Sequence, residues 1–272
     1  MNKILLPLLF LLLSFSNAFS QESKSLKKIL ELKIPREGGA NGAQVVWHPL
    51  QQKYYAAMAG NASFCLAVFS DAGTLLSPST QETLFDIRGL WYNPSTRSIQ
   101  MNGYDDYGWG EYLLNSTGLP TDVKELQEGL HQPDAQSSGA FDSREKVVYF
   151  ISEDGNIEKY DFEMGEYREL IELALGKTKE SDKDNTFSKS NYDVFEDYNS
   201  TTLIYTGIRG AEIGLLNHYK KQVELYNITT GYMTRKLLFP TDAPANTILN
   251  FAYTNGVYWL FDKENRVWKG YK

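Results

Sequence analysis

A glycine-rich stretch of the sequence combines aromatic rings with carboxylates. Residues 102–112 read NGYDDYGWGEY. Three aromatic residues in it have flat faces that can stack on sugar rings, namely Tyr104, Tyr107 and Trp109. Asp105 and Asp106 can accept hydrogen bonds from hydroxyl groups, and their oxygens suit a hard cation such as Ca²⁺. The stretch predicts a carbohydrate-binding loop without a cofactor, and Ca²⁺ at the two carboxylates is an alternative. Another interpretation is that the rings cover the end of a sheet while both carboxylates are solvated.

A second glycine-rich stretch, 207–219, carries three polar side chains suited to a ligand. Arg209 can pair with a carboxylate or a sugar acid, and Glu212 and His218 can act as acid or base. A hairpin extension held by an internal Arg–Glu pair is the alternative interpretation. Asn61 is the strong polar residue of a shorter loop at 59–63. We predict that these four residues share one ligand-binding face with the 102–112 loop.

The same carboxylates leave a polysaccharide-acting hydrolase or lyase as the alternative to simple binding. Glycoside hydrolysis needs two carboxyl groups about 5 to 10 Å apart, which Asp105 or Asp106 could form with Glu212 across a channel. Asp142 and Asp193 are further acidic candidates, although each also suits a turn.

Other catalytic signatures are missing from the sequence. It has no Gly-x-Ser-x-Gly motif, phosphate-cradling loop or dinucleotide fingerprint. The three histidines are far apart in the chain, which predicts no metal site: His48, His131 and His218. Cys65, the single cysteine, lies between apolar residues and is predicted to be a buried packing residue. A non-catalytic binding protein is therefore the leading hypothesis.

A degenerate repeat determines how these loops are placed. Four turns end on a glycine, at intervals of 45, 47 and 66 residues: Gly73, Gly118, Gly165 and Gly231. Upstream of each, an aromatic residue closes a strand and a second strand follows; these aromatics are Trp47, Trp91, Phe141 and Phe195. Their recurrence favours packing between repeats over ligand binding. A fifth copy begins at 251 and ends before its fourth strand.

Four short strands per repeat of 40 to 50 residues are typical of a β-propeller blade. We predict five four-stranded blades, or six if the longest interval hides one, with a two-sheet sandwich as the alternative. The strand missing from the last blade is predicted to be 29–34, pairing beside Val267 and Trp268. In this arrangement the 102–112 and 207–219 stretches join second to third strands, on one face around the channel. The pattern resembles secreted bacterial β-propeller repeat proteins, but it has no WD, kelch or Asp-box series to imply a family active site.

Composition and the N-terminus indicate the compartment and the class of partner. Residues 1–20 have a lysine, an apolar run and small polar residues, as in a secretory signal peptide cleaved between Ser20 and Gln21. We expect a single domain over 21–272, secreted or periplasmic, monomeric and without a membrane span. With 27 Lys+Arg against 34 Asp+Glu, the net charge is −7, which argues against nucleic acid. The expected partner is a carbohydrate or a protein.

Overall fold

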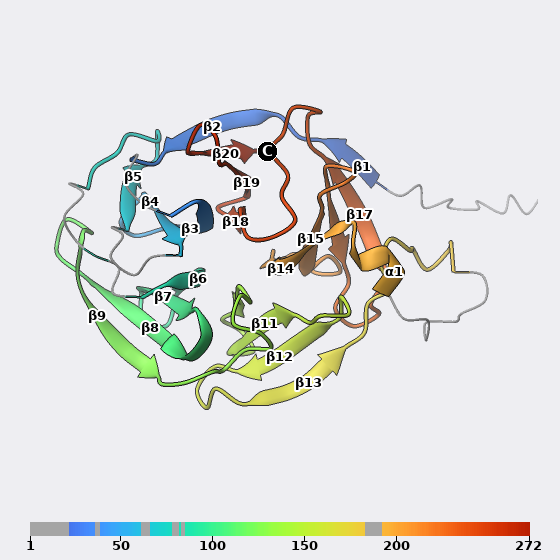
Figure 1. Cartoon of the computed structure of the whole chain (residues 1–272), viewed down its shortest axis with the longest axis horizontal. Helices are drawn as coiled ribbons and strands as arrows, with labels where there is room; N and C mark the ends of the chain where they lie inside the picture. Colours follow the sequence, from blue (N-terminus) through green and yellow to red (C-terminus); the bar gives the residue numbers. More distant parts are fainter. Residues whose placement is uncertain (1–21, 36–38, 61–65, 78–81, 83–84, 183–191) are drawn as a thin grey trace, which may run out of the picture.

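Five β-sheets surround a central channel (Figure 1). The computed structural model describes residues 22–35, 39–60, 66–77, 82, 85–182 and 192–272, so the predicted leader, Asn61 and Cys65 lie outside the described residues. Each sheet is one blade, with its first strand beside the channel and its later strands farther out. The predicted five-bladed β-propeller is confirmed. The described residues form neither a sixth blade nor a two-sheet sandwich.

Each blade contains three to five strands, which are given below from the channel outwards. Blade 1 contains β3 (Asn41–His48), β4 (Lys53–Ala59) and β5 (Ala67–Ser70), and Leu75 bridges to Phe69 at its outer edge. Blade 2 contains β6 (Ile87–Asn93), β7 (Ser98–Gly103), β8 (Trp109–Leu114) and β9 (Pro120–Gln127). Blade 3 contains β10 (Ala140–Asp142), β11 (Val147–Ile151), β12 (Ile157–Asp161) and β13 (Tyr167–Ile171). Blade 4 contains β14 (Tyr198–Tyr205), β15 (Ile213–Asn217), β16 (Gln222–Tyr226), β17 (Met233–Leu238) and β1 (Glu22–Ser25), and blade 5 contains β18 (Phe251–Thr254), β19 (Val257–Asp262), β20 (Val267–Tyr271) and β2 (Lys28–Lys33).

Packing between blades explains why the second strands are so apolar. Every residue of β11 (VVYFI) and β19 (VYWLFD) is buried. β-Branched and aromatic residues suit such strands, because each blade packs against a neighbour on both of its faces. The core is correspondingly divided into clusters that lie between blades, such as Leu32, Trp259 and Trp268 of blade 5 with Val45 and Tyr54 of blade 1.

The N-terminal segment closes the ring, as predicted. β2 pairs antiparallel with β20, with Leu32 opposite Trp268 and Lys33 opposite Val267. Just before β2, β1 pairs in parallel with β17 of blade 4, an addition that the sequence did not predict. One continuous segment therefore covers the outer edges of two neighbouring blades, which Figure 1 shows in blue. β17 and β20 are thereby paired on both sides, and β1 and β2 become the outermost strands of their sheets.

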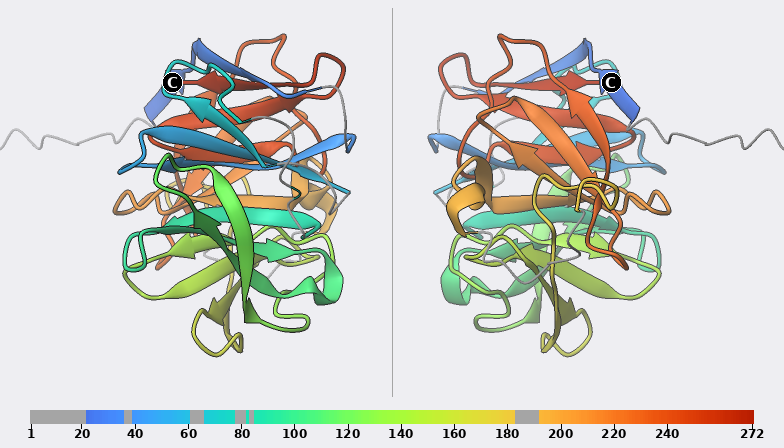
Figure 2. Two further views of the ribbon diagram at one scale, coloured as in Figure 1. Left: turned by 90° about the vertical axis from the view of Figure 1, so that its left-hand side faces the viewer. Right: turned by 90° about the vertical axis from the view of Figure 1, so that its right-hand side faces the viewer.

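The hairpins fall into two groups at opposite ends of the ring. Neighbouring inner strands run parallel, as the bridge between Ser138 and Thr202 shows, so all blades have the same direction. The end that carries the hairpins joining first to second and third to fourth strands is called the 1–2 end. The other, called the 2–3 end, carries the second-to-third hairpins and the connections between blades. Figure 2 shows the strands running from one end to the other.

The predicted strand order of blade 4 was wrong by one strand. The innermost strand is β14, whereas Phe195 lies in the single helical turn α1 (Tyr192–Phe195). The polar run Asn-Ser-Thr-Thr in β14 looks like a turn, but its Asn199 is fully buried. The Asn199 amide donates to the carbonyls of Asn246 and Leu249, and its oxygen accepts from the Thr202 N–H. These bonds stabilise a polar residue in an inner strand, where sequence patterns favour apolar ones.

Two further segments also differ from expectation. The good helix formers of 169–175 would also suit a helical turn, but residues 169–171 belong to β13 and no helix follows over 172–175. Residues 121–138 look like one long connection in the sequence, but they begin with most of β9, the fourth strand of blade 2. Both are outer strands with one solvated face, so their sequences contain many exposed charged residues and lack the apolar signal of the inner strands.

Candidate functional site

A cavity of about 300 Å³ occupies the channel and opens at its 1–2 end. The inner strand of every blade contributes to its wall: β3, β6, β10, β14 and β18. Pro49 and Asn255, both in first-to-second hairpins, lie at its mouth, while Gln44 and Gly139 line its inner end. No Asp or Glu is among the described residues that line it. The cavity is therefore lined by apolar and neutral polar residues, and its hairpin residues place a mouth at the 1–2 end.

An aromatic ring from each blade surrounds the mouth. These residues stand at or near the ends of the five inner strands, and all are half-buried: Trp47, Tyr92, Phe141, Tyr205 and Tyr253. Each is held by a second ring behind it, with centroid distances between 4.6 and 5.9 Å. These contacts restrict the rotamers of the rings and leave part of each ring facing the cavity. The mouth is thus a preformed aromatic surface.

The wall also presents backbone hydrogen-bonding groups. Each of the five inner strands forms the channel-side edge of its sheet, so one row of its N–H and C=O groups is not used within the sheet. Some of these groups have other partners: the Trp47 N–H donates to the Thr254 hydroxyl at 2.9 Å, and the Ser138 N–H donates to the Thr201 carbonyl at 2.8 Å. The remaining groups can bind hydroxyl groups of a ligand or water.

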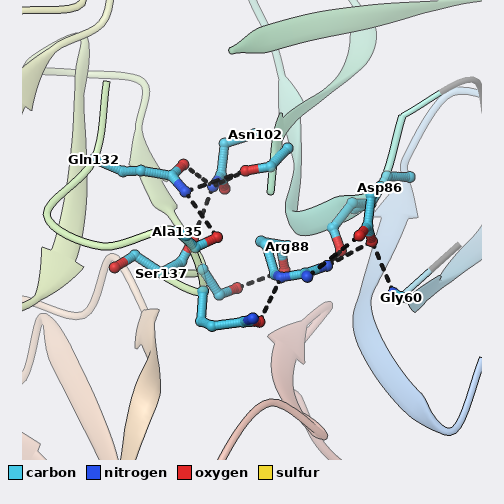
Figure 3. A network of polar contacts seen from close by, with 11 residues as sticks. Gly60, Asp86, Arg88, Asn102, Gln132, Ala135 and Ser137 are labelled. Atoms are coloured by element: carbon cyan, nitrogen blue, oxygen red, sulfur yellow. Dashed lines mark hydrogen bonds and ion pairs between the residues drawn. The ribbon is translucent and has the colours of Figure 1, made fainter. Parts of the chain in front are cut away.

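At the 2–3 end, a polar network ties three chain segments together (Figure 3). Arg88, whose side chain is only 4% exposed, forms an ion pair with Asp86 at 2.6 Å and donates to Gln136 at 2.8 Å. The Ser138 hydroxyl donates to the Arg88 carbonyl at 2.8 Å, and Gln44 donates to that hydroxyl at 3.4 Å. The network therefore links the connections on both sides of blade 2 to a residue of the cavity wall.

Asn102 forms the second half of this network. Its amide donates to Gln132 and to the Ser137 carbonyl, and its oxygen accepts from the Gly139 N–H at 2.9 Å. Gly89 lies so close that a Cβ atom there would be 2.2 Å from the Asn102 oxygen. The polar groups of this network are thus satisfied by one another, and the network is structural.

The aromatic–acidic loop of blade 2 lies at the 2–3 end, as predicted, but only part of it is accessible. Asp105–Tyr107 form a 3-10 turn in which both aspartates are exposed and Tyr107 is 41% exposed. The Arg88 guanidinium lies 4.6 Å from the centre of the Tyr104 ring. Trp109 is fully buried and stacks on Phe162 at 5.6 Å. Its assignment as a ligand-binding residue is corrected, because a ring inside the core cannot stack on a ligand.

The residues predicted from blade 4 are separated by the corrected strand order. Arg209 and Glu212 lie in the first-to-second hairpin at the 1–2 end, and His218 lies at the 2–3 end. Glu212 accepts hydrogen bonds from the backbone N–H groups of Gly210 and Ile228, at 2.6 and 3.2 Å, so it braces two hairpins. Arg209 is exposed and forms no ion pair with Glu212. His218 contacts the Glu196 carbonyl at 3.0 Å.

The predicted pair of catalytic carboxylates is not formed. Asp105 and Asp106 lie at the 2–3 end and Glu212 at the 1–2 end, and none of them lines the cavity. Within the described residues, no three His, Cys, Asp or Glu side chains gather to hold a metal ion. His48 and His131 instead contact backbone carbonyls. Of the other two acidic candidates, Asp142 lies beside the cavity mouth, and the side chain of Asp193 lies outside the described set.

Sequence reasoning missed the mouth of the channel. The repeated aromatics Trp47 and Phe141 were correctly recognised as packing residues, but each also exposes one side to the cavity. Tyr205 and Tyr253 were not predicted as candidates. The strands of blade 4 were assigned one position off, and the fifth copy was used only to identify the missing strand. The available signal was the position of each aromatic at the end of an inner strand.

Comparison with known proteins supports the fold. No family model matches the chain, and a search of curated proteins finds no match. Among solved structures, the glutaminyl cyclase of Myxococcus xanthus has a TM-score of 0.52 and 9% identity, over 93% of this chain and 98% of that one. A nidogen/laminin complex has a TM-score of 0.44 and 11% identity over 75% of this chain, and the match spans 66% of that chain, just under two thirds. At 9% identity, the likeness to the glutaminyl cyclase shows the fold alone. No helix in the described residues is long and apolar enough to cross a membrane.

Proposed function

We propose that the protein is an exported, non-catalytic binding protein that holds a carbohydrate at the 1–2 end of its channel. The observation that carries this proposal is the aromatic ring contributed by every blade around one open cavity. Sugars present C–H faces that stack on aromatic rings and hydroxyl groups that need hydrogen-bond partners. The inner strand edges supply such partners. Export rests on the sequence of residues 1–20.

The dimensions of the cavity favour a small ligand. A volume of about 300 Å³ is at the lower end of the range for ligand pockets in proteins. It suits one sugar residue, such as the terminal unit of a longer chain whose remainder lies outside the mouth. The absence of carboxylates among the described lining residues supports binding without hydrolysis, since glycoside hydrolysis requires a pair of them.

The test is calorimetric binding of mono- and oligosaccharides identified on a glycan array. Trp47→Leu and Phe141→Leu keep apolar bulk in the packing clusters but remove the rings at the mouth. We expect each to weaken sugar binding at least tenfold, because stacking and its desolvation are lost. Thermal unfolding of each variant would show whether the fold is retained.

Tyr107→Ala provides the matched control at the opposite end of the ring. Tyr107 is an exposed aromatic of the aromatic–acidic loop, and its replacement is expected to leave binding unchanged. Loss of binding in Tyr107→Ala, with normal binding in the two mouth variants, would assign the site to the 2–3 end and refute the channel site. Binding of a protein and of no sugar would refute the carbohydrate assignment.

A further inference from the structure

The first-to-second hairpins of this acidic protein carry more cations than acids. They contain four cations, Arg97, Arg144, Lys146 and Arg209, against two acids, Glu145 and Glu212. Glu145 is paired with Lys159 at 2.8 Å, and Glu212 accepts two backbone hydrogen bonds. Lys146 is paired with Glu163 from the third-to-fourth hairpin of its blade. Three arginines remain, of which Arg144 also forms an ion pair with Asp142.

Arg144 is the arginine attached to the cavity wall. Its guanidinium donates to the hydroxyl of Tyr205, one of the five mouth aromatics, and lies 5.9 Å from the centre of that ring. Its Nε is also 3.6 Å from a carboxylate oxygen of Asp142. These contacts orient the guanidinium, yet 64% of the side chain is exposed. Of its five N–H groups, at least three have no partner among the described residues.

Asp142 is the nearest negative charge, and its oxygens are already engaged. One oxygen accepts the Tyr205 hydroxyl at 2.5 Å, and the other accepts the backbone N–H of Arg144 at 2.9 Å. Burial, together with the hydrogen bond to Asp142, raises the pKa of Tyr205 to about 12, so the phenol stays protonated and keeps donating at neutral pH. Asp142 therefore positions Arg144 both through Tyr205 and by its own contact with the Arg144 Nε, and three of the four terminal N–H groups of the guanidinium keep no partner among the described residues.

We propose that the ligand carries a carboxylate next to the stacked sugar ring, as a hexuronic acid does, and that Arg144 binds this carboxylate. The inference rests on the proposed carbohydrate function, which it narrows to acidic sugars. A planar guanidinium with paired N–H groups matches the geometry of a carboxylate. A ring seated among the five aromatics would place its exocyclic group at the rim of the mouth, where Arg144 stands.

The experiment compares sugars that differ only in this group: the methyl glycosides of glucuronic acid and glucose, and of galacturonic acid and galactose. Calorimetry on the mature chain at low salt is expected to show at least one acidic sugar binding about tenfold more tightly than its neutral partner. The ratio should fall as salt is raised, because the contact is partly exposed. In Arg144→Gln, the affinity for the acidic sugar should fall close to that for its neutral partner, while the neutral sugar still binds. Arg144→Lys should restore part of the preference for the acidic sugar.

Arg209→Gln is the matched control, since it removes an exposed arginine at the same end, whereas Arg144 is the one that contacts the mouth residue Tyr205. We expect it to keep the wild-type ratio. Equal binding of acidic and neutral sugars, or an unchanged ratio in Arg144→Gln, would overturn the acidic-sugar inference and leave the carbohydrate function standing. Binding of neither sugar would overturn both. Acetate competing as well as the acidic sugar would show that the carboxylate alone is recognised, which also contradicts the inference.

Discussion

Ring closure by the N-terminal strand can be tested at Leu32. This residue of β2 is fully buried and packs in one cluster with Phe261 and Trp268. Replacing a buried leucine by alanine costs between about 2 and 5 kcal/mol, depending on how far the surroundings collapse. Two rigid aromatic neighbours limit such collapse, so we expect Leu32→Ala to lower the free energy of unfolding by about 3 to 4 kcal/mol.

Urea unfolding followed by tryptophan fluorescence would measure this loss. Ile29→Ala is the control within the same strand, because Ile29 is 53% exposed and its replacement should change the stability by less than about 0.5 kcal/mol. If β2 locks the last blade to the first, Leu32→Ala should shift one cooperative transition that all blades share. Equal small effects of both variants, or the separate loss of a single blade, would refute closure by this strand.

Three other substitutions test polar interactions. Asp86→Ala leaves the buried Arg88 guanidinium without its carboxylate and should lower the free energy of unfolding by about 3 kcal/mol, measured by urea unfolding. Replacing both residues by apolar ones should cause a smaller loss. Burial alone would raise the pKa of Asp262, but hydrogen bonds led by that from Lys269 outweigh it and lower the pKa to about 2. The carboxylate therefore stabilises the fold above about pH 4. Between pH 4 and pH 2, the free energy of unfolding of the wild type should fall by about 2 kcal/mol more than that of Asp262→Asn. Parallel pH profiles of the two proteins would contradict this. Tyr226→Phe removes a buried hydroxyl that donates to the Glu224 carboxylate and accepts from the Gly176 N–H. It should lower the free energy of unfolding by about 2 kcal/mol, measured by thermal or urea unfolding. An unchanged stability would mean that water replaces the hydroxyl.

The fold could be predicted from sequence because its signals repeat. Alternating strands, turn glycines and strand-closing aromatics recur in order, and the missing strand of the last copy had one obvious supplier near residue 30. The prediction failed where a repeat departs from the pattern. Buried Asn199 makes β14 resemble a turn, and this one misplaced strand put Arg209 and Glu212 at the wrong end of the channel.

The site could not be predicted in the same way, because its residues have two roles. Trp47 and Phe141 pack against neighbouring rings and also face the cavity. A sequence shows that an aromatic recurs, but the exposed side of a half-buried ring depends on how five strands converge. Trp109 shows the reverse error: a glycine-rich context suggested exposure, whereas stacking on Phe162 from the next blade buries it.

The two ends of the channel differ in what their polar groups do, and this difference supports a ligand at the 1–2 end. At the 2–3 end, Arg88 and Asn102 use their donors and acceptors on protein partners, so a ligand there would have to compete with existing bonds. At the 1–2 end, aromatic faces and strand edges surround an open cavity. Arg144 is held in place by Tyr205, and at least three of its N–H groups have no partner among the described residues. Preorganised groups with unused bonding capacity are what a binding site requires, since little free energy is lost in ordering them when a ligand arrives.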